Sequence, residues 1–411
     1  MTLPPSLLMA WRNLWRHRRR TWLTASAMIF ANALLIFGIC LQTGTYQMMI
    51  DNGLRLLTGH LQVQAQGYLD DPRMRTTVAQ IQPLARQLRD QLHRPAAARA
   101  QGFALLSSEQ RSFGVQILGV EPAQERHISF LPAQIKRGSY LSEHAQRQLV
   151  LGSVAARNLK VGVGDEITLL GSGLDGSFAA AVLTVTGIFE TGLNDLDRGL
   201  AQMHLADFQS VFSMQGAGHQ IVLRSASLAD VAALKTAVSQ TLNSRPELTT
   251  LDWDQLQPEL RQAIAADMAS SWFMYGVLII LVAFSVMNTQ LMAVLERIRE
   301  FGVMLALGLR PARLSLLVLI ETAMLALLGL VFGLLVGGSL AALLSHTGFT
   351  FPGMEEYAAQ FNMDARIYPR LTFWSVMTGP LVIFTASLLA SLYPALRLLG
   401  LQPLNAMRSA T

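Results

Sequence analysis

Four long stretches of this chain carry almost no charge. No Asp, Glu, Lys or Arg occurs within residues 21–50, 268–295 or 371–396, and residues 314–354 hold a single acid, Glu321. Each stretch exceeds the roughly 20 residues that a helix needs to cross a hydrocarbon core of about 30 Å. The sequence therefore predicts an α-helical membrane protein with four transmembrane helices.

These stretches also divide the chain into segments. A large polar region separates the first span from the second, and its length of about 220 residues is sufficient for a folded domain with its own core. The predicted order is a cytoplasmic amphipathic segment (1–20), a span (21–46), an extracytoplasmic domain (47–269), a span (270–295), a cytoplasmic helix (296–312), a span (313–344), a short external loop (345–370), a span (371–397) and a tail (398–411).

The distribution of arginine predicts the orientation of the chain in the membrane. Basic residues gather just before the first span and again between the second and third spans, where the positive-inside rule places cytoplasmic segments. Four spans then put both termini in the cytoplasm and residues 47–269 outside. Lysine occurs only three times, so we attribute the net charge of +5 to topology and expect no nucleic-acid partner. The arginines concerned are Arg12, Arg16, Arg18, Arg19, Arg20, Arg297, Arg299, Arg310 and Arg313.

The external region mixes strand and helix patterns, which predicts an α+β domain. A break near residues 130–150 would divide it into two subdomains. We expect helices at 81–92, 151–159, 207–212 and 228–242, and strands at 59–65, 111–120, 167–170, 180–189 and 220–223.

A short charged segment between the second and third spans has the pattern of an amphipathic helix. Val294, Ile298, Phe301 and Leu305 recur at three- and four-residue spacing, and Gly308 follows as a C-terminal stop. One interpretation is a solvated turn whose arginines obey the positive-inside rule. The other is a helix that docks a cytoplasmic partner.

Motifs of catalysis are absent from the sequence. None of the three lysines follows a glycine, so there is no P-loop, and neither His-Glu-x-x-His nor Gly-x-Ser-x-Gly occurs. A single cysteine provides no thiolate metal site. We therefore expect no enzyme, no metal and no cofactor bound by this chain.

A few residues inside the spans are distinctive. Glu321 is an intramembrane carboxylate, for which we favour a structural ion pair or hydrogen bond over proton transfer. Asn288 is expected to bond between helices. Glycines at four-residue spacing predict close helix packing; they are Gly329, Gly333, Gly337 and Gly338.

With these residues in view, the chain resembles the MacB/FtsX/LolC–LolE family of ABC transporter permeases. Four passages carry the resemblance, and together they extend over nearly the whole chain. They are Trp-Arg-Asn-Leu-Trp-Arg to Arg-Arg-Thr (11–21), Leu-Gly…Leu…Val-Gly-Asp (151–165), Asn…Glu-Arg-Ile-Arg-Glu-Phe-Gly…Ala-Leu-Gly (288–308), and Tyr-Pro-Ala…Pro-Leu-Asn-Ala-Met-Arg (393–408). The last two are the specific ones.

The resemblance implies a bacterial inner-membrane protein whose external domain is a MacB-like periplasmic core domain. It implies pairing with a second copy or a paralogue, and docking of a separate cytoplasmic ATPase that binds ATP and Mg²⁺. The helix between spans two and three would be the coupling helix, with the contacts carried over to Glu296, Arg297, Glu300, Phe301, Gly302 and Leu307. The chain lacks a fused ATPase and has a larger external domain than FtsX, so it most resembles the lipoprotein-releasing permeases.

On that resemblance the function is extraction or export of a lipoprotein or other amphiphile, delivered to a periplasmic carrier. Lipid chains would lie between spans one and two, near Leu34, Leu35, Phe37, Phe284 and Met287, although ordinary helix packing explains these residues equally well. Two alternatives stay open. One is a mechanotransmission scaffold that activates a periplasmic partner without transport, and the other is a permease that removes peptide antibiotics.

Overall fold

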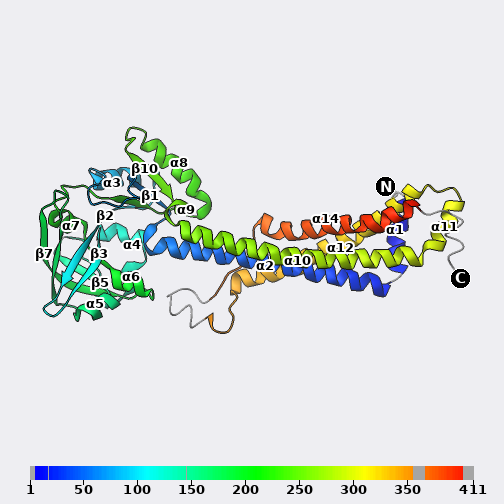
Figure 1. Ribbon diagram of the computed structural model, residues 1–411, viewed down its shortest axis with the longest axis horizontal. Helices are drawn as coiled ribbons and strands as arrows, with labels where there is room; N and C mark the ends of the chain where they lie inside the picture. Colours follow the sequence, from blue (N-terminus) through cyan, green and yellow to red (C-terminus); the bar gives the residue numbers. More distant parts are fainter. Residues whose placement is uncertain (1–4, 17, 145, 355–365, 401–411) are drawn as a thin grey trace. The chain divides into compact units, whose positions relative to one another are not determined.

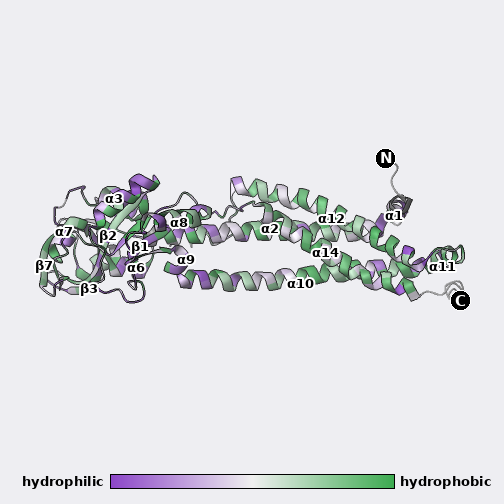
Figure 2. Cartoon of the chain, turned by 90° about the horizontal axis from the view of Figure 1, so that it is seen from above, coloured by the Kyte–Doolittle hydropathy of each residue, from purple (hydrophilic) through white to green (hydrophobic). Residues whose placement is uncertain are grey.

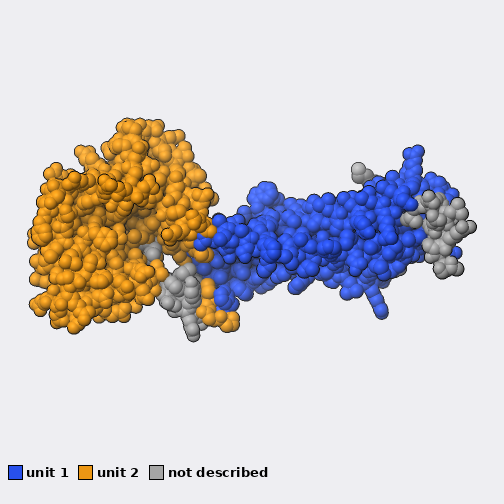
Figure 3. All heavy atoms as spheres, in the orientation of Figure 1, with its two compact units in different colours: residues 1–48, 263–351, 366–411 blue, residues 49–262, 352–365 orange. Residues whose placement is uncertain are grey.

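The computed structural model describes residues 5–16, 18–144, 146–354 and 366–400 (Figure 1). The chain forms two compact units, coloured separately in Figure 3. Unit 1 is Met1–Met48, Ala263–Phe351 and Arg366–Thr411, and unit 2 is Met49–Gln262 with Pro352–Ala365. The end of the C-terminal signature, most of the predicted tail and part of the predicted 345–370 loop lie outside the described residues.

Unit 1 is helical. Among the described residues, four helices are long and apolar enough to cross a membrane, namely α2 (Arg18–Gly53), α10 (Pro258–Glu296), α12 (Pro311–Thr347) and α14 (Phe373–Arg397, extended by η4, Leu398–Gly400). Each predicted span falls largely within one of them, and hydrophobic residues dominate their central parts in Figure 2. A shorter helix, α1 (Pro5–Arg16), precedes α2, and α11 (Ile298–Ala306) connects α10 to α12.

Glycines bring α12 close to α2. A Cβ atom added at Gly333 would lie 2.4 Å from Asn32 Cβ, and one at Gly337 would lie 2.7 Å from Ala33 Cα. Any larger residue there would force the helices apart, so the predicted small-residue packing is confirmed for these positions. It is wrong for Gly338, which has no neighbouring atom within 4 Å of an added Cβ.

Unit 2 is built on one mixed sheet. In the described part of the chain its ten strands run in the order β10-β1-β9-β2-β3-β8-β5-β7-β4, and β6 pairs with β2 and β7. The pairs β3–β8 and β5–β7 are parallel, whereas the others are antiparallel. The strands are β1 (Leu61–Ala65), β2 (Ala96–Ser107), β3 (Ser112–Val120), β4 (Ile135–Gly138), β5 (Gln148–Gly152), β6 (Glu166–Ser172), β7 (Phe178–Phe189), β8 (Leu200–His204), β9 (Gln220–Leu223) and β10 (Leu248–Asp252).

Short helices accompany this sheet. They are α3 (Ile81–Leu92), α4 (Pro122–Ile128), α5 (Ser153–Leu159), α6 (Asn194–Gly199), α7 (Leu205–Val211), α8 (Val231–Thr241) and α9 (Trp253–Leu256), with the single turns η1 (Leu54–Thr58), η2 (Leu131–Gln134) and η3 (Leu228–Asp230). The apolar faces of α3, α7 and α8 and the inner side chains of the strands form one aliphatic core. The α+β class predicted from the sequence is therefore confirmed.

The predicted division of this domain into two subdomains is wrong. Strands β2 and β3, which precede the expected break, pair with β6, β8 and β9, which follow it, so both sides belong to the same sheet. Residues 151–159, predicted as a helix, begin as the end of β5 and become helical only at Ser153. The long strand β2 was not predicted, because its alanine-rich start lacks the β-branched residues that indicate a strand.

Candidate coupling site

A short helix with defined ends lies between α10 and α12. Arg297 leaves helical geometry and separates α10 from α11, and the positive φ of 94° at Gly308 ends the segment beyond α11. Glycine adopts that conformation without steric cost. Pro311 then occupies the first turn of α12, where its missing N–H has no helical partner to lose. The predicted helix and its stop are confirmed.

The apolar stripe of α11 faces the interior of unit 1. Phe301 is fully buried and belongs to a cluster with Val294 of α10, residues of α12 and the end of α14. Gly302 is buried as well. The assignment of Phe301 and Gly302 to a partner contact is therefore corrected, since the stripe is used to attach α11 to its own unit.

The opposite face of α11 is exposed. Leu307 is 78% exposed and Val303 47% exposed, and Arg299 and Glu296 are also at the surface. Val303 and Arg299 were not among the predicted contacts, although their spacing from Leu307 on the same helix face could have indicated them.

Arg297 joins three helices of unit 1. Its Nη1 atom donates to both carboxylate oxygens of Glu321 in α12, at 3.1 and 3.2 Å, and its Nε atom lies 3.4 Å from Glu300 of α11. Asn13 of α1 donates to the same Glu321 carboxylate at 2.6 Å. The guanidinium group also stacks over Phe301, 5.0 Å from the ring centroid.

This pairing is largely shielded from solvent, since the Arg297 and Glu321 side chains are 11% and 7% exposed. A buried carboxylate is costly unless a cation and hydrogen bonds satisfy it. Glu321 has both, which agrees with the structural role favoured from the sequence.

Two further ion pairs extend the contacts to the N-terminal arginines. Arg16 of α1 lies 2.8 Å from Glu300, and Arg20 of α2 lies 2.9 Å from Glu296. Neither pair was predicted from the sequence, in which these arginines indicated topology and an amphipathic N-terminal segment. Together the contacts tie α11 and the end of α10 to α1, α2 and α12.

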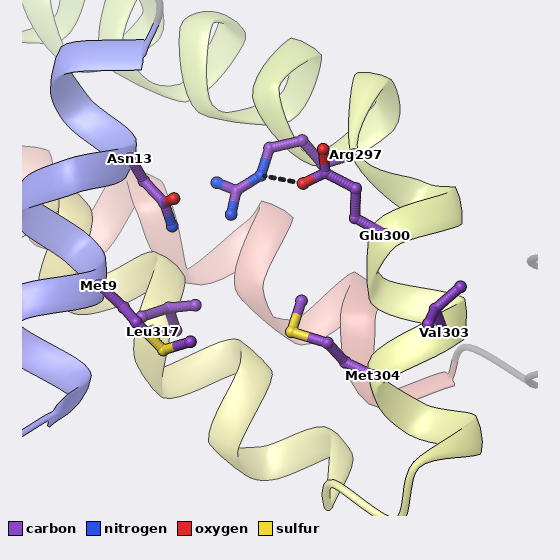
Figure 4. A pocket seen from close by; sticks show the side chains of 7 residues that line it. All are labelled: Met9, Asn13, Arg297, Glu300, Val303, Met304 and Leu317. Atoms are coloured by element: carbon purple, nitrogen blue, oxygen red, sulfur yellow. Dashed lines mark hydrogen bonds and ion pairs between the residues drawn. The ribbon is translucent and has the colours of Figure 1, made fainter.

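A cavity of about 400 Å³ lies between α1, α11 and α12 (Figure 4). The polar groups of Asn13, Arg297 and Glu300 lie on one side of it, and Met9, Met304 and Leu317 provide apolar walls. The cavity therefore lies directly beside the Arg297 and Glu300 side chains that form the ion pairs described above.

The residues predicted to contact lipid chains do not form one surface. Leu34 of α2 and Phe284 of α10 are exposed, but Leu35 is buried. A Cβ atom added at Gly379 of α14 would lie 2.9 Å from Leu35 Cβ, so Leu35 fills a helix contact and its predicted role is corrected. Phe37 packs edge-to-face on Phe349, with ring centroids 5.8 Å apart.

Two more predicted positions lie on α10. Met287 is half-buried, and the Asn288 side chain is exposed on the surface of the unit. Within the described residues Asn288 makes no hydrogen bond to another helix of the same chain. The expected interhelical bond is therefore not formed within unit 1.

Comparison with known proteins agrees with this architecture. Residues 21–241 match the MacB-like periplasmic core domain, and residues 272–403 match the C-terminal region of FtsX-like permeases. The lipoprotein-releasing system transmembrane protein LolC of Xylella fastidiosa is 27% identical over 91% of this chain and 90% of its own length.

The alignments with two other relatives cover a smaller share of this chain. The lipoprotein-releasing system transmembrane protein LolE of Haemophilus influenzae is 26% identical over 74% of this chain and 75% of its own length. The macrolide export ATP-binding/permease protein MacB of Bordetella avium is 24% identical over 80% of this chain and 51% of its own length.

The matched core domain covers more than half of the chain, and the second match includes α11, α12 and α14. Four apolar helices and these relatives identify an inner-membrane protein with a periplasmic domain. The chain belongs to the family of ABC transporter permeases that join a MacB-like periplasmic core domain to an FtsX-like permease region.

Proposed function

We propose that this permease couples ATP hydrolysis by a separate cytoplasmic ATPase subunit to the extraction of a lipoprotein, or of a similar amphiphile, from the inner membrane. The observation that carries the proposal is the attachment of α11 to α12 through Arg297, which pairs with Glu300 of α11 and with Glu321 of α12. The relatives named for lipoprotein release support the substrate class. In this proposal ATP and Mg²⁺ are bound by the ATPase, and both chain termini are cytoplasmic.

The exposed face of α11 is the proposed docking surface for the ATPase. Leu307 and Val303 would enter an apolar groove on the partner, and Arg299 and Glu296 would pair with charges at its edge. Binding of an amphipathic helix in a groove commonly uses anchors at this spacing.

Motion of the docked helix would pass to the spans through the ion pairs. A displacement of α11 moves Arg297 and therefore pulls on Glu321 of α12, while Arg16 connects the same helix to α1. Helices α2 and α10 contain residues of both units, so they are the proposed route to the periplasmic domain. A second copy or a paralogue would complete the transporter, with Leu34 and Phe284 exposed to the acyl chains and a periplasmic carrier receiving the cargo.

The docking surface can be tested by co-purification. The tagged chain is isolated in mild detergent, and the ATPase bound to it is quantified by mass spectrometry. Leu307→Asp should remove the ATPase, because a carboxylate replaces an apolar anchor that is 78% exposed and so contributes little to folding. Leu69→Asp, at an exposed leucine of unit 2, is the matched control. Wild-type recovery of the ATPase with Leu307→Asp would exclude this surface.

A second experiment tests whether the ion pair of Arg297 with Glu321 transmits motion of α11 to α12. Glu321→Gln should keep the ATPase bound but reduce the ATP-triggered release of co-purified lipidated protein at least tenfold, because Arg297 loses its charged partner in α12. Glu259→Gln, at an exposed acid in the first turn of α10, should behave as wild type. Normal release by Glu321→Gln would show that the ion pair is only structural.

The same purification separates extraction from mechanotransmission. A stoichiometric lipoprotein that leaves on addition of ATP supports extraction. Recovery of the ATPase with a soluble periplasmic protein, and no lipidated species, supports the scaffold alternative. That alternative draws on the FtsX-like match of residues 272–403.

A further inference from the structure

Unit 2 contains a basic pocket that the proposed function does not use. Its volume is about 440 Å³, and three arginines from separate parts of the chain contribute to its wall. Arg55 comes from η1, Arg126 from α4 and Arg224 from the segment after β9. The remaining lining residues are Ser129, Phe130, Pro132, Ala133 and Tyr140.

Neutral groups hold the arginines in place. The backbone carbonyl of Arg55 accepts a hydrogen bond from the Phe130 N–H at 3.1 Å, and Nη1 of Arg224 donates to the His127 carbonyl at 3.2 Å. The Arg126 guanidinium lies 5.9 Å from the centroid of the Tyr140 ring. The first contact fixes the backbone of Arg55, and the other two position the guanidinium groups of Arg224 and Arg126 without neutralising their charge.

The pocket has an excess of positive charge. Within the described residues none of the three arginines forms an ion pair, and no carboxylate lines the wall. Of the acids nearby, Glu125 is already satisfied by Arg99, with N–O distances of 2.6 and 3.0 Å. Burial, and then the neighbouring Arg55 charge, lower the pKa of Arg224, while Asp51 opposes them. Like charges are therefore gathered, and no carboxylate of the described residues forms an ion pair with them.

A buried hydroxyl in the same wall has no partner. Ser129 is 94% buried, since its exposed fraction is 6%, and its Oγ atom makes no hydrogen bond within the described structure. Buried polar groups in folded proteins are nearly always hydrogen-bonded, so the unpaired Ser129 hydroxyl is a polar group of the wall that a ligand or a water molecule would satisfy. This observation is independent of the charge on the arginines.

We propose that the pocket binds an oxyanion of the phosphate type. The planar guanidinium groups of Arg126 and Arg224 suit the paired oxygens of a phosphate, Arg55 adds a third positive charge, and Ser129 supplies a hydroxyl donor. Inorganic phosphate and the phosphoryl headgroup of a lipid share this chemistry. The proposal does not depend on which cargo the permease carries.

Inorganic phosphate is the probe for the first test. The full-length protein in a sugar-based, phosphate-free detergent is titrated with phosphate, with sodium chloride at equal ionic strength as the reference, and its Tm is measured. A ligand that binds only the folded state raises Tm in a saturable manner. We expect such a rise for the wild type and an apparent affinity at least tenfold weaker for Arg126→Gln, whose side chain makes no ion pair that folding would lose.

Two further variants make the test specific. Arg224→Lys keeps the charge but loses the planar donor pair, so it should bind phosphate less tightly than the wild type. Arg86→Gln removes an exposed arginine of α3 outside the pocket and should respond as the wild type does. A Tm response equal to that in sodium chloride, or one unchanged by Arg126→Gln, would overturn the proposal.

Nanodiscs distinguish the two sources of phosphate. If a lipid headgroup fills the pocket, wild-type protein in phosphatidylglycerol nanodiscs should no longer respond to added phosphate. If free phosphate is the ligand, the response should persist in those nanodiscs. In both cases the response in detergent must depend on Arg126, and its independence of Arg126 would again exclude the site.

Discussion

In unit 1, α12 approaches α2 through glycines, whereas in unit 2 the helices α3 and α8 bury leucine, isoleucine, valine and alanine side chains in the core. The amide of Asn32 in unit 1 donates to the Gly329 carbonyl at 3.2 Å, so a polar group lies inside the helix contact. The aliphatic cluster of unit 2 instead gathers residues from both the helices and the strands.

The difference follows from the surroundings of each unit. Lipid tails are as apolar as leucine, so hydrophobic burial does little to bring membrane helices together, and close packing and hydrogen bonds must do so. In water the burial of apolar area is the dominant favourable contribution. Each unit can therefore be tested through the interaction on which it relies.

The largest loss of unfolding free energy is expected when the buried ion pair of unit 2 is broken. Arg99→Ala leaves the fully buried Glu125 carboxylate without a cation, and we expect a loss of about 3–5 kcal/mol of unfolding free energy. Denaturant unfolding of the full-length protein in detergent measures it. Arg86→Ala, at an exposed site, is the control. A loss below about 1 kcal/mol would mean that the aliphatic core alone decides the stability of this unit.

Low pH should reduce the unfolding free energy of unit 2 through the buried His219. Burial lowers the pKa of His219 from 6.5 to about 4, so the unfolded state binds the proton more readily. The stabilisation is complete above pH 6.5 and is lost as pH falls towards 4, which amounts to about 3 kcal/mol. Unfolding measured at several pH values should become less pH-dependent in His219→Gln. The exposed His144→Gln should keep the wild-type slope.

Close packing in unit 1 predicts a smaller but selective effect. Gly333→Leu introduces a side chain where an added Cβ already lies 2.4 Å from Asn32, and overpacking of this kind costs about 1–3 kcal/mol. Gly338→Leu places the same side chain in open space and should leave Tm unchanged. Equal Tm values for the two variants would contradict the view that close packing at Gly333 stabilises the contact between α2 and α12.

The smallest effect concerns the exposed end of the coupling network. Arg16 and Glu300 are 59% and 41% exposed, and surface ion pairs contribute about 0–1 kcal/mol. Arg16→Ala should therefore shift the unfolding midpoint only slightly, whereas Arg297→Ala should shift it clearly because Glu321 is shielded. Similar shifts in both variants would show that burial does not determine which of the two ion pairs contributes more to stability.

Local sequence patterns predicted those elements well whose structure is determined by their own residues. The helix at 81–92 and the strand at 220–223 were predicted with the bounds of α3 and β9, because amphipathic spacing and a short apolar run are visible along the chain. Strand β2 was missed because its alanines are held by pairing with β3, β6 and β9, which are distant in sequence.

The coupling site shows the same limit. The C-terminal end of α11 follows from Gly308 and the start of α12 from Pro311, but the direction of the apolar stripe of α11 does not follow from the sequence. A stripe that suits a partner protein suits an intramolecular cluster equally well. Only the fold places Phe301 in the interior and Leu307 outside.

Consecutive residues alone determined the four spans, the intervening α+β domain and the position of the connecting helix, because hydropathy and helix signals accumulate along the chain. Tertiary structure decided that Arg297 pairs with Glu321, that Arg16 reaches Glu300 and that Arg224 joins the basic pocket. Each depends on side chains that are distant in sequence, and their meeting is set by packing geometry that no local pattern contains.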